Sequence, residues 1–181
     1  MDLRETAIPG CVVVVPERHA DARGHFARTW DAEAFAAAGL PGAFDQMSTS
    51  FNARRGTLRG MHLQRAPHAE TKLVRCTRGA VWDVCLDLRE GSPTRGRWHA
   101  ETLSAENGRA LVVPEGCAHG FLTLADASEV AYAIAGRYAP DAAWGVRYDD
   151  PAFGIAWPEP VRVIVERDAA YPDWTGSADG R

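Results

Sequence analysis

The fold of this chain is decided by the stretch Gly56-Thr-Leu-Arg-Gly-Met-His-Leu-Gln-Arg-Ala-Pro-His-Ala-Glu-Thr-Lys72. If residues 57–64 form a β-strand, side chains alternate between faces, and the face that carries His62 also carries Leu58, Gly60 and Gln64. A lone histidine on such a face is more often a core residue than a functional one. Here Arg59 and Lys72 stand on either side of it, which favours a site inside a barrel.

Short strands surround this stretch. Runs of β-branched and apolar residues, separated by turn signals, predict strands at 11–15, 46–52, 57–64, 72–77, 80–88, 98–103, 109–113, 120–124 and 130–135. Residues 21–26 read as a turn that leads into another strand. One helix is expected, from an N-cap at Asp31 to Gly39. Many short strands with little helix predict an all-β sandwich or barrel, with the Pro-rich segment from Asp150 onward packing back on it.

The segment 81–88 alternates strictly enough to predict which side chains share a face. Trp82, Val84, Leu86 and Leu88 fall on one face of this strand, whereas Asp83 and Asp87 fall on the other. The apolar run 11–15 is expected to form an edge strand that helps to pair two copies of the chain.

Length and composition narrow the class of protein. The chain has 181 residues, which predicts one domain over residues 1–181 with a sizeable core. A net charge of −4 argues against general binding of nucleic acid or anionic membranes, so an anionic ligand requires local arginines. No apolar run approaches the roughly 20 residues of a membrane span. Residues 1–6 carry acids and lack the apolar core of a secretory signal, so we expect a cytoplasmic protein.

The four cysteines give no sign of a metal or redox motif. Cys11, Cys76, Cys85 and Cys117 contain no Cys-x-x-Cys pair and lie in apolar, strand-like sequence. They are therefore expected to be small, reduced core residues, with a four-cysteine zinc site as the weaker alternative.

A second histidine motif follows downstream. Gly108, Pro114, Gly116 and His119 match the spacing of the second motif of the cupin barrel, in which a tight turn leads a histidine into the interior. The first cupin motif is degenerate, because five residues separate His62 from His68. A metal site made of His62, His68, Glu70 and His119 is the less favoured alternative, since the two histidines do not obviously share a strand face.

Several motifs then follow one another in register: Arg59-Gly-Met-His-Leu-Gln64, Lys72-Leu-Val, Asp87-Leu-Arg-Glu-Gly-Ser-Pro-Thr94, Leu103-Ser, Pro114-Glu-Gly-Cys-Ala-His-Gly-Phe121, Asp149-Asp-Pro151 and Ile155-Ala-Trp-Pro158. With these motifs the sequence resembles the dTDP-4-dehydrorhamnose 3,5-epimerase family from about residue 10 to residue 174. The resemblance implies a cupin jelly-roll barrel, a homodimer and no metal or other cofactor. It also implies a nucleoside-diphosphate 4-keto-6-deoxy sugar as substrate.

The resemblance also implies roles for individual residues. His62 matches the general base, Asp168 the aspartate that pairs with it, Tyr132 the proton donor, and Lys72 the cation near the enolate. Residues that match substrate contacts, or stand beside them, are Arg23, Phe26, Arg28, Gln46, Arg59, Lys72, His119, Tyr138 and Arg167. Arg23 and Arg59 are expected to hold the diphosphate, because guanidinium groups bind phosphate oxygens in bidentate fashion.

Some positions depart from the family pattern. Glu70 replaces a glutamine, Arg28 and Ala143 replace glutamates, Arg167 replaces a lysine, and Gln46-Met-Ser48 replaces Gln-Asp-Asn. These departures leave the matched base, acid and dyad intact. They leave open which nucleotide and sugar are bound.

The chemistry requires residues of these types. Epimerisation beside a ketone needs a base, an acid on the opposite face of the sugar, and a donor for the enolate oxygen. Histidine has the intrinsic pKa of a base near neutrality, and a buried carboxylate fixes its tautomer. Alternatives are epimerisation at C3 or C5 alone, a ketoisomerase, a metal-dependent cupin enzyme, or a non-catalytic cupin that binds a sugar nucleotide.

Overall fold

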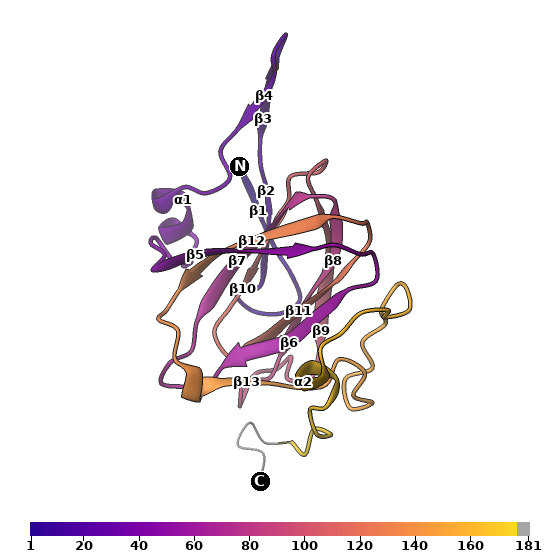
Figure 1. Cartoon of the computed structure of the whole chain (residues 1–181). Coiled ribbons are helices and arrows are strands. Elements are labelled where there is room, and N and C mark those ends of the chain that lie inside the picture. Colours follow the sequence, from indigo (N-terminus) through magenta and orange to yellow (C-terminus); the bar gives the residue numbers. More distant parts are fainter. Residues whose placement is uncertain (177–181) are drawn as a thin grey trace.

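Two antiparallel β-sheets form the body of the protein in the computed structural model, which describes residues 1–176 (Figure 1). One sheet has the strand order β1 (Asp2–Glu5), β2 (Val12–Val15), β10 (Ala110–Val113), β7 (Thr71–Arg78), β12 (Ser128–Ala135) and β5 (Gln46–Asn52). The other has the order β13 (Ala143–Gly145), β6 (Leu58–Gln64), β11 (Cys117–Thr123), β8 (Ala80–Asp87) and β9 (Trp98–Ser104). This arrangement confirms the predicted all-β, cupin-type jelly roll.

The core between the two sheets is built from inward-facing aliphatic, aromatic and cysteine side chains. It includes Val13, Val74, Leu111 and Val130 from the first sheet, and Val81, Cys85, Cys117 and Phe121 from the second. All four cysteines are free and buried, as predicted. Val, Leu and Cys fit this position because they fill the space between pleated surfaces without adding charge.

The outer face of the six-stranded sheet is covered by helix α1 (Ala32–Ala37). Asp31 caps this helix as predicted, since its carboxylate accepts a hydrogen bond from the Ala34 amide at 3.1 Å. Phe35 is fully buried against the sheet, and the partly buried Trp30 and Phe44 pack beside it. The short helix near the N-terminus is therefore anchored by one aromatic residue.

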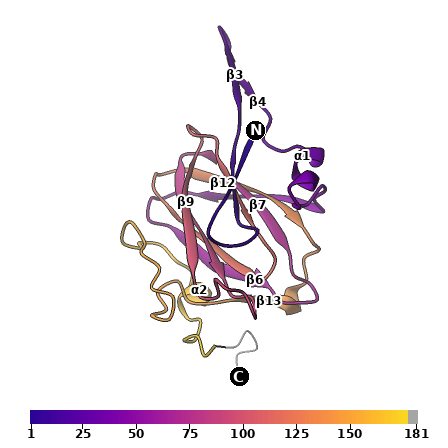
Figure 2. The same ribbon diagram turned by 180° about the vertical axis from the view of Figure 1, so that it is seen from behind.

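The outer face of the five-stranded sheet is covered by the C-terminal segment, which lies on the opposite side of the body from α1 (Figures 1 and 2). A cluster of tryptophans joins the two, and Trp82 of β8 meets Trp157 of the segment at 5.4 Å between ring centroids. This covering confirms that the segment packs back on the barrel. It also confirms the predicted faces of β8, where Val84 and Leu86 lie in the tryptophan layer and Asp83 bonds to His119.

A hairpin made of β3 (Arg18–Asp21) and β4 (Gly24–Ala27) projects away from the body (Figure 2). Seven of its eight strand residues are exposed, so it packs on almost nothing within its own chain. The run 11–15 behaves differently from the prediction. The run contains β2, which is not an edge strand, because β1 pairs with one side of β2 and β10 pairs with the other.

Five short elements were not expected from the sequence. They are β1, β3, β13, the 3₁₀ turn η1 (Pro140–Ala142) and helix α2 (Glu166–Ala169). Strand β11 also begins at Cys117, three residues earlier than predicted, because pairing with β8 extends as far as Asp87. The sequence of each of these elements gives only a weak local preference for helix or strand, so the element depends on tertiary contacts.

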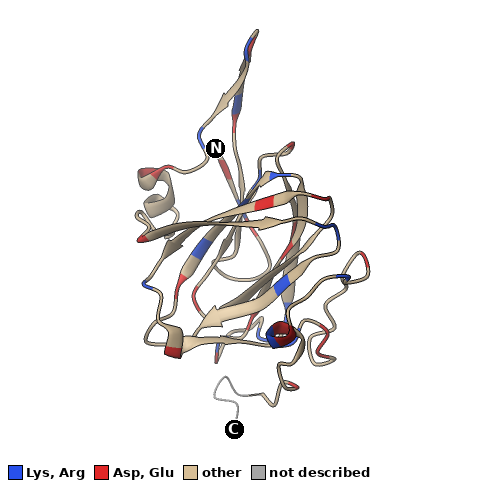
Figure 3. Cartoon of the chain, in the orientation of Figure 1, with Lys and Arg blue, Asp and Glu red and all other residues tan. Residues whose placement is uncertain are grey.

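The surface carries charges of both signs. Figure 3 shows acidic and basic residues interspersed over the sheets and the hairpin rather than gathered on one face. No helix within residues 1–176 is long and apolar enough to cross a membrane.

Candidate active site

A cavity of about 720 Å³ opens between the two sheets. Its volume lies within the range of about 300–1,000 Å³ that is typical of small-molecule sites. Both sheets and the C-terminal segment contribute to its wall, which includes Gln46, Ser50, Arg59, His62, Glu70, Lys72, His119, Tyr132, Tyr138, Arg167 and Asp168. The cavity therefore brings together nine of the twelve site residues that the sequence predicted.

The centre of the site is a hydrogen bond between His62 of β6 and Asp168 of α2. His62 Nε2 lies 2.8 Å from Asp168 Oδ1, and the Gly60 amide donates to Asp168 Oδ2 at 3.2 Å. Asp168 is 1% exposed, whereas about a third of the His62 side chain is exposed to the cavity. His62 Nδ1 has no hydrogen-bond partner in the part of the chain that the structure describes, so it is the nitrogen available to a substrate.

The charge on Asp168 is maintained despite its burial. Burial alone would raise the pKa of this carboxyl group. The His62 hydrogen bond and charge, the Gly60 amide and the Arg167 guanidinium outweigh burial, and the pKa lies below its ordinary value. A carboxylate that remains ionised at neutral pH can fix the His62 tautomer and stabilise its protonated form.

A glycine contact allows the two central strands to approach. A Cβ atom on Gly60 would lie 2.5 Å from the Gly120 Cα atom of β11, closer than any side chain tolerates, and Gly60 has a φ of +137°. The absence of a side chain at this point brings β6 and β11 together. The amide of the same glycine donates to Asp168.

Tyr132 lies in the other sheet, on β12. Its hydroxyl is 3.2 Å from the Ser50 hydroxyl, and its ring meets that of His119 edge-on at 6.1 Å between centroids. Burial raises the pKa of Tyr132 well above its ordinary value, so the phenol stays protonated across the neutral range. A candidate base and a candidate acid therefore line one cavity from the two sheets.

His119 forms a second histidine–aspartate pair. Its Nε2 lies 2.9 Å from Asp83 Oδ1, and both side chains are almost completely buried. His119 lies directly opposite His62 in the pairing of β11 with β6. The structure thus adds Asp83, which the sequence did not single out as a site residue, although the predicted faces of β8 placed it away from the tryptophan layer.

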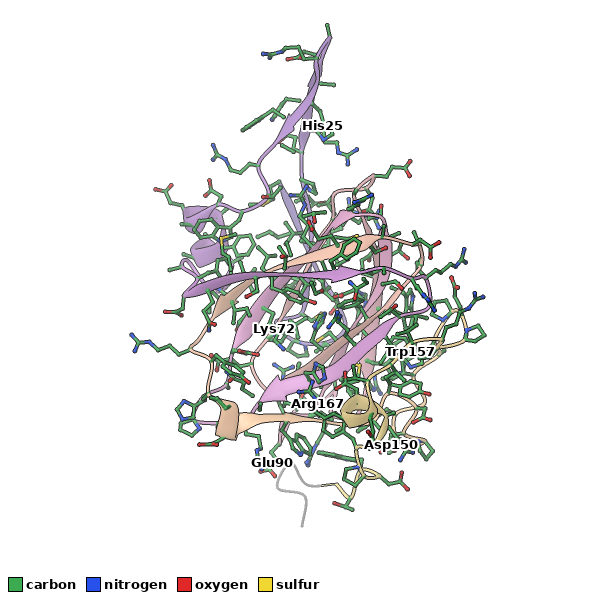
Figure 4. All side chains as sticks on the ribbon, in the orientation of Figure 1. His25, Lys72, Glu90, Asp150, Trp157 and Arg167 are labelled. Carbon is green, nitrogen blue, oxygen red and sulfur yellow. The ribbon has the colours of Figure 1, made fainter. Side chains whose placement is uncertain are left out.

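Lys72 of β7 is the cation on the cavity wall. Its Nζ donates to the His62 carbonyl oxygen at 3.3 Å and lies 3.2 Å from Glu70 Oε1. Figure 4 shows Lys72 on the barrel wall and Arg167 on α2. The ammonium group is thus close to the backbone of the candidate base.

Other predicted contacts line the cavity around this centre. Arg59 Nε donates to Asn52 Oδ1 at 2.7 Å, and Gln46 Nε2 donates to the Gly136 carbonyl at 2.9 Å. Tyr138 is 64% exposed beside the same cavity. Ser48, which ends the Gln46-Met-Ser48 motif, also lines it. Ser50 and residues 163–165 line it as well, and no motif in the sequence pointed to them.

Three predicted contacts lie elsewhere in this chain. Arg23 pairs with Asp21 at the hairpin tip, Phe26 is 68% exposed on the hairpin, and Arg28 pairs with Asp31 at the start of α1. Figure 4 places His25, which lies between Arg23 and Phe26, far from Lys72 and Arg167. Arg23 and Arg59 are therefore not neighbours within one chain.

The alternative metal site does not form. His68 lines a separate surface groove with Arg65 and Asp141, away from the main cavity. Within residues 1–176, no group of three or more histidine, cysteine or acidic side chains is arranged to hold a metal ion. The arrangement in the cavity is instead suited to proton transfer on both faces of a bound molecule.

Comparison with known proteins agrees with this geometry. The sequence profile described as dTDP-4-dehydrorhamnose 3,5-epimerase matches residues 5–175. The chain is 39% identical to the dTDP-4-dehydrorhamnose 3,5-epimerase of Sinorhizobium fredii over 173 residues, which cover 95% of this chain and 89% of that protein.

Solved structures are similar as well. The dTDP-4-dehydrorhamnose 3,5-epimerase of Elizabethkingia anophelis superposes with a TM-score of 0.92 at 36% identity, covering 96% of both chains. The Legionella pneumophila dTDP-6-deoxy-D-glucose-3,5-epimerase, solved with dTDP-4-keto-L-rhamnose, gives a TM-score of 0.87 at 35% identity, with 94% and 90% of the two chains covered. The family profile, the relatives and the barrel agree, and the chain belongs to the dTDP-4-dehydrorhamnose 3,5-epimerase family.

Proposed function

We propose that this protein epimerises dTDP-4-dehydro-6-deoxyglucose at C3 and C5 to give dTDP-4-dehydrorhamnose. The observation that carries this proposal is the placement of His62, paired with Asp168 of α2, and of Tyr132 in opposite sheets around one cavity. The relative from Legionella pneumophila was solved with a keto sugar nucleotide of this kind, which supports the substrate class. One domain, residues 1–181, carries the activity.

In this proposal His62 removes the proton from the carbon next to the C4 ketone. Its Nδ1 is free to accept the proton, because Nε2 is bonded to Asp168. The Asp168 carboxylate stabilises the imidazolium that forms, and its lowered pKa keeps it charged at neutral pH. Such a base typically contributes about 10²–10⁴-fold to the rate.

Tyr132 returns a proton to the opposite face of the sugar. The phenol is protonated at the start of the cycle because burial raises its pKa, and the Ser50 hydroxyl orients it. The C4 oxygen becomes negatively charged after proton removal, and the Lys72 ammonium stabilises that charge. Neither step requires a cofactor.

Arg59 and His119 bind the remainder of the substrate. Arg59 lines the cavity and is held by Asn52, so its guanidinium can face a diphosphate oxygen. An acidic protein needs such a local cation to hold a dianionic diphosphate. Gln46, Tyr138 and Arg167 contribute to the same wall.

We also propose that two copies pair, so that the hairpin of one reaches the cavity of the other. The hairpin carries Arg23 and Phe26 without packing on its own body. Beside it lies an apolar groove of about 460 Å³ lined by Trp30, Phe44 and Met47, and Met47 is 83% exposed. An exposed apolar groove next to a projecting hairpin is typical of a subunit interface.

Complementation tests this pairing. A His62→Ala chain and an Arg23→Glu chain each lose activity alone, but a mixed dimer has one site with an intact base and an intact hairpin. When equal amounts of the two chains mix at random, half of the dimers are mixed, and each of these has one complete site out of two. About a quarter of the wild-type activity per chain should therefore return. A monomer in sedimentation at micromolar concentration, or no recovery on mixing, would contradict the pairing.

The reaction itself is tested by NMR of the product formed in deuterated water. Wild-type protein is expected to incorporate deuterium at C3 and C5 of the sugar and to release the doubly inverted product. A product changed at one carbon would identify a monoepimerase, and a moved carbonyl group would identify a ketoisomerase. We place the enzyme in the cytoplasm, because four free cysteines suit a reducing compartment.

A further inference from the structure

A row of buried polar groups leads from the Tyr138 segment to Lys72. Gln64 of β6 is 3% exposed, and both the oxygen and the nitrogen of its side-chain amide have hydrogen-bond partners. Its Oε1 accepts from the Ala139 amide at 2.7 Å. The two N–H groups of its Nε2 are shared among the His68 carbonyl at 3.0 Å, the Arg137 carbonyl at 3.1 Å and the Glu70 carboxylate. Gln64 therefore holds the backbone on both sides of Tyr138.

The same amide group also holds Glu70. Gln64 Nε2 lies 2.9 Å from Glu70 Oε2, and Glu70 Oε1 lies 3.2 Å from Lys72 Nζ. The Glu70 and Lys72 side chains are both about one-tenth exposed and line the cavity. Each carboxylate oxygen thus has one partner, so the orientation of the carboxylate is fixed.

A buried ion pair of this kind contributes little net stability, because desolvation of both charges offsets their attraction. Its physical effect is on position. A lysine side chain has four rotatable bonds and loses rotamer entropy when it is fixed. The Glu70 carboxylate and the His62 carbonyl hold the ammonium from two directions before any substrate binds.

We propose that Glu70 is a positioning residue, braced by Gln64, that fixes the Lys72 ammonium beside the candidate base and links this placement to the Tyr138 segment. The inference rests on the proposed function, in which Lys72 stabilises the enolate oxygen. Glu70 acts through Lys72 and does not itself exchange a proton with the sugar.

Steady-state kinetics of Glu70→Ala and Glu70→Gln provide the first test. Glu70→Ala should lower kcat about 10- to 100-fold while KM changes less than about threefold, because misplacement of Lys72 affects the transition state. Glu70→Gln keeps one acceptor oxygen for Lys72 but turns its NH2 group towards the Gln64 NH2 group, so it should recover part of this loss. Equal loss in both variants, or an unchanged kcat in Glu70→Ala, would overturn the positioning role. Glu90→Ala removes an exposed glutamate on a distant loop and is the matched control (Figure 4).

The brace is tested by Gln64→Leu, alone and combined with Glu70→Ala. Gln64→Leu should lower kcat at least as far as Glu70→Ala and should raise KM as well, because the Tyr138 segment is released. Adding Glu70→Ala to Gln64→Leu should then lower kcat little further, since both changes disrupt the same row of contacts from Gln64 through Glu70 to Lys72. Fully additive losses would mean that the two residues act independently.

Crystal structures of the Glu70 variants give a readout that needs no turnover. Lys72 Nζ should leave the His62 carbonyl in Glu70→Ala and keep that contact in Glu70→Gln. A Lys72 side chain that stays in place in Glu70→Ala overturns the inference, whatever the activity. A wild-type protein inactive on the proposed substrate would instead refute the proposed function, and the displacement of Lys72 would still be measured.

Discussion

His62 and His119 lie opposite each other on β6 and β11, yet each imidazole bonds through Nε2 to a different aspartate. Asp168 from the C-terminal segment holds His62, and Asp83 from β8 holds His119. About a third of the His62 side chain faces the cavity, but only 6% of the His119 side chain is exposed. The two neighbouring rings are thus fixed separately, and His62 is the accessible one.

His62→Ala is expected to abolish both turnover and exchange of the ring protons of the sugar with deuterated solvent. Loss of the base removes the first step, so the rate should fall about 10²–10⁴-fold. Exchange is followed by proton NMR of the keto sugar nucleotide. His68→Ala changes a histidine in a separate groove and should behave like the wild type. Exchange that persists in His62→Ala would mean that the base is misassigned.

Tyr132→Phe is expected to separate proton removal from product formation. The ring and its packing remain and only the hydroxyl bonded to Ser50 is lost, so substrate should bind normally. Deuterium should still enter the sugar, partly with retention, while epimerised product falls by about 10²-fold or more. Isotope pattern and product stereochemistry are read in one NMR time course. Epimerisation at the wild-type rate would make Tyr138 the better candidate acid.

Arg59→Ala is expected to raise KM much more than it lowers kcat. A lost charge-assisted bond to the diphosphate costs about 1.5–3 kcal/mol, or about 10- to 100-fold in binding. Arg59→Lys should recover only part of this, because an ammonium group cannot form the bidentate contact. Titration calorimetry with dTDP gives the affinity directly. An unchanged affinity together with lower kcat would assign Arg59 to the chemistry instead.

Activity is expected to survive treatment with EDTA followed by gel filtration. His62 and His119 each direct Nε2 to a carboxylate, and His68 lies in another groove, so the histidines do not converge on one point. The rate before and after chelation should agree. Loss of turnover that a single divalent metal restores would refute metal-independent catalysis.

Acid is expected to destabilise the protein partly through Asp87. This buried carboxylate accepts hydrogen bonds from Arg89, Ser92 and Thr94. Burial would raise its pKa, but these hydrogen bonds hold the pKa well below the ordinary value of 3.8. Its contribution to stability is therefore complete above pH 3.8 and is lost as the pH falls towards the lowered pKa.

Urea unfolding of Asp87→Asn measures this contribution. The variant should be about 1–3 kcal/mol less stable than the wild type at pH 7, and this difference should shrink below about pH 4. Asp149→Asn changes an exposed aspartate and should show no such trend. A difference that stays constant down to pH 2.5 would show that the Asp87 charge does not matter.

Most of the fold could be predicted from sequence because its signals are local. Alternating apolar residues at 80–88 and the Asp31 cap gave the strand, its faces and the helix correctly. The position of the run 11–15 could not be predicted, because β1 has the charged sequence Asp-Leu-Arg-Glu and becomes a strand only by pairing with β2. Sheet order is a long-range property that periodicity does not contain.

Part of the site was also beyond local reasoning. The resemblance to the family placed His62, Tyr132, Lys72 and Asp168 together, and the cavity contains all four. Asp83 and Ser50 were missed as site residues, because only the pairing of strands brings them to His119 and Tyr132. Arg23 and Phe26 lie outside the cavity of their own chain, so their predicted role depends on a second copy.

Asp168 stands 106 residues after His62 in the chain, and its short helix α2 is held at the cavity by contacts to β6. During synthesis, the residues of both sheets, including His62, are made before Asp168, whose carboxylate orients His62. A fragment that ends before α2 would carry His62 with an unfixed tautomer and a Gly60 amide without its acceptor. Epimerase activity can therefore serve as a reporter for the docking of α2 on β6.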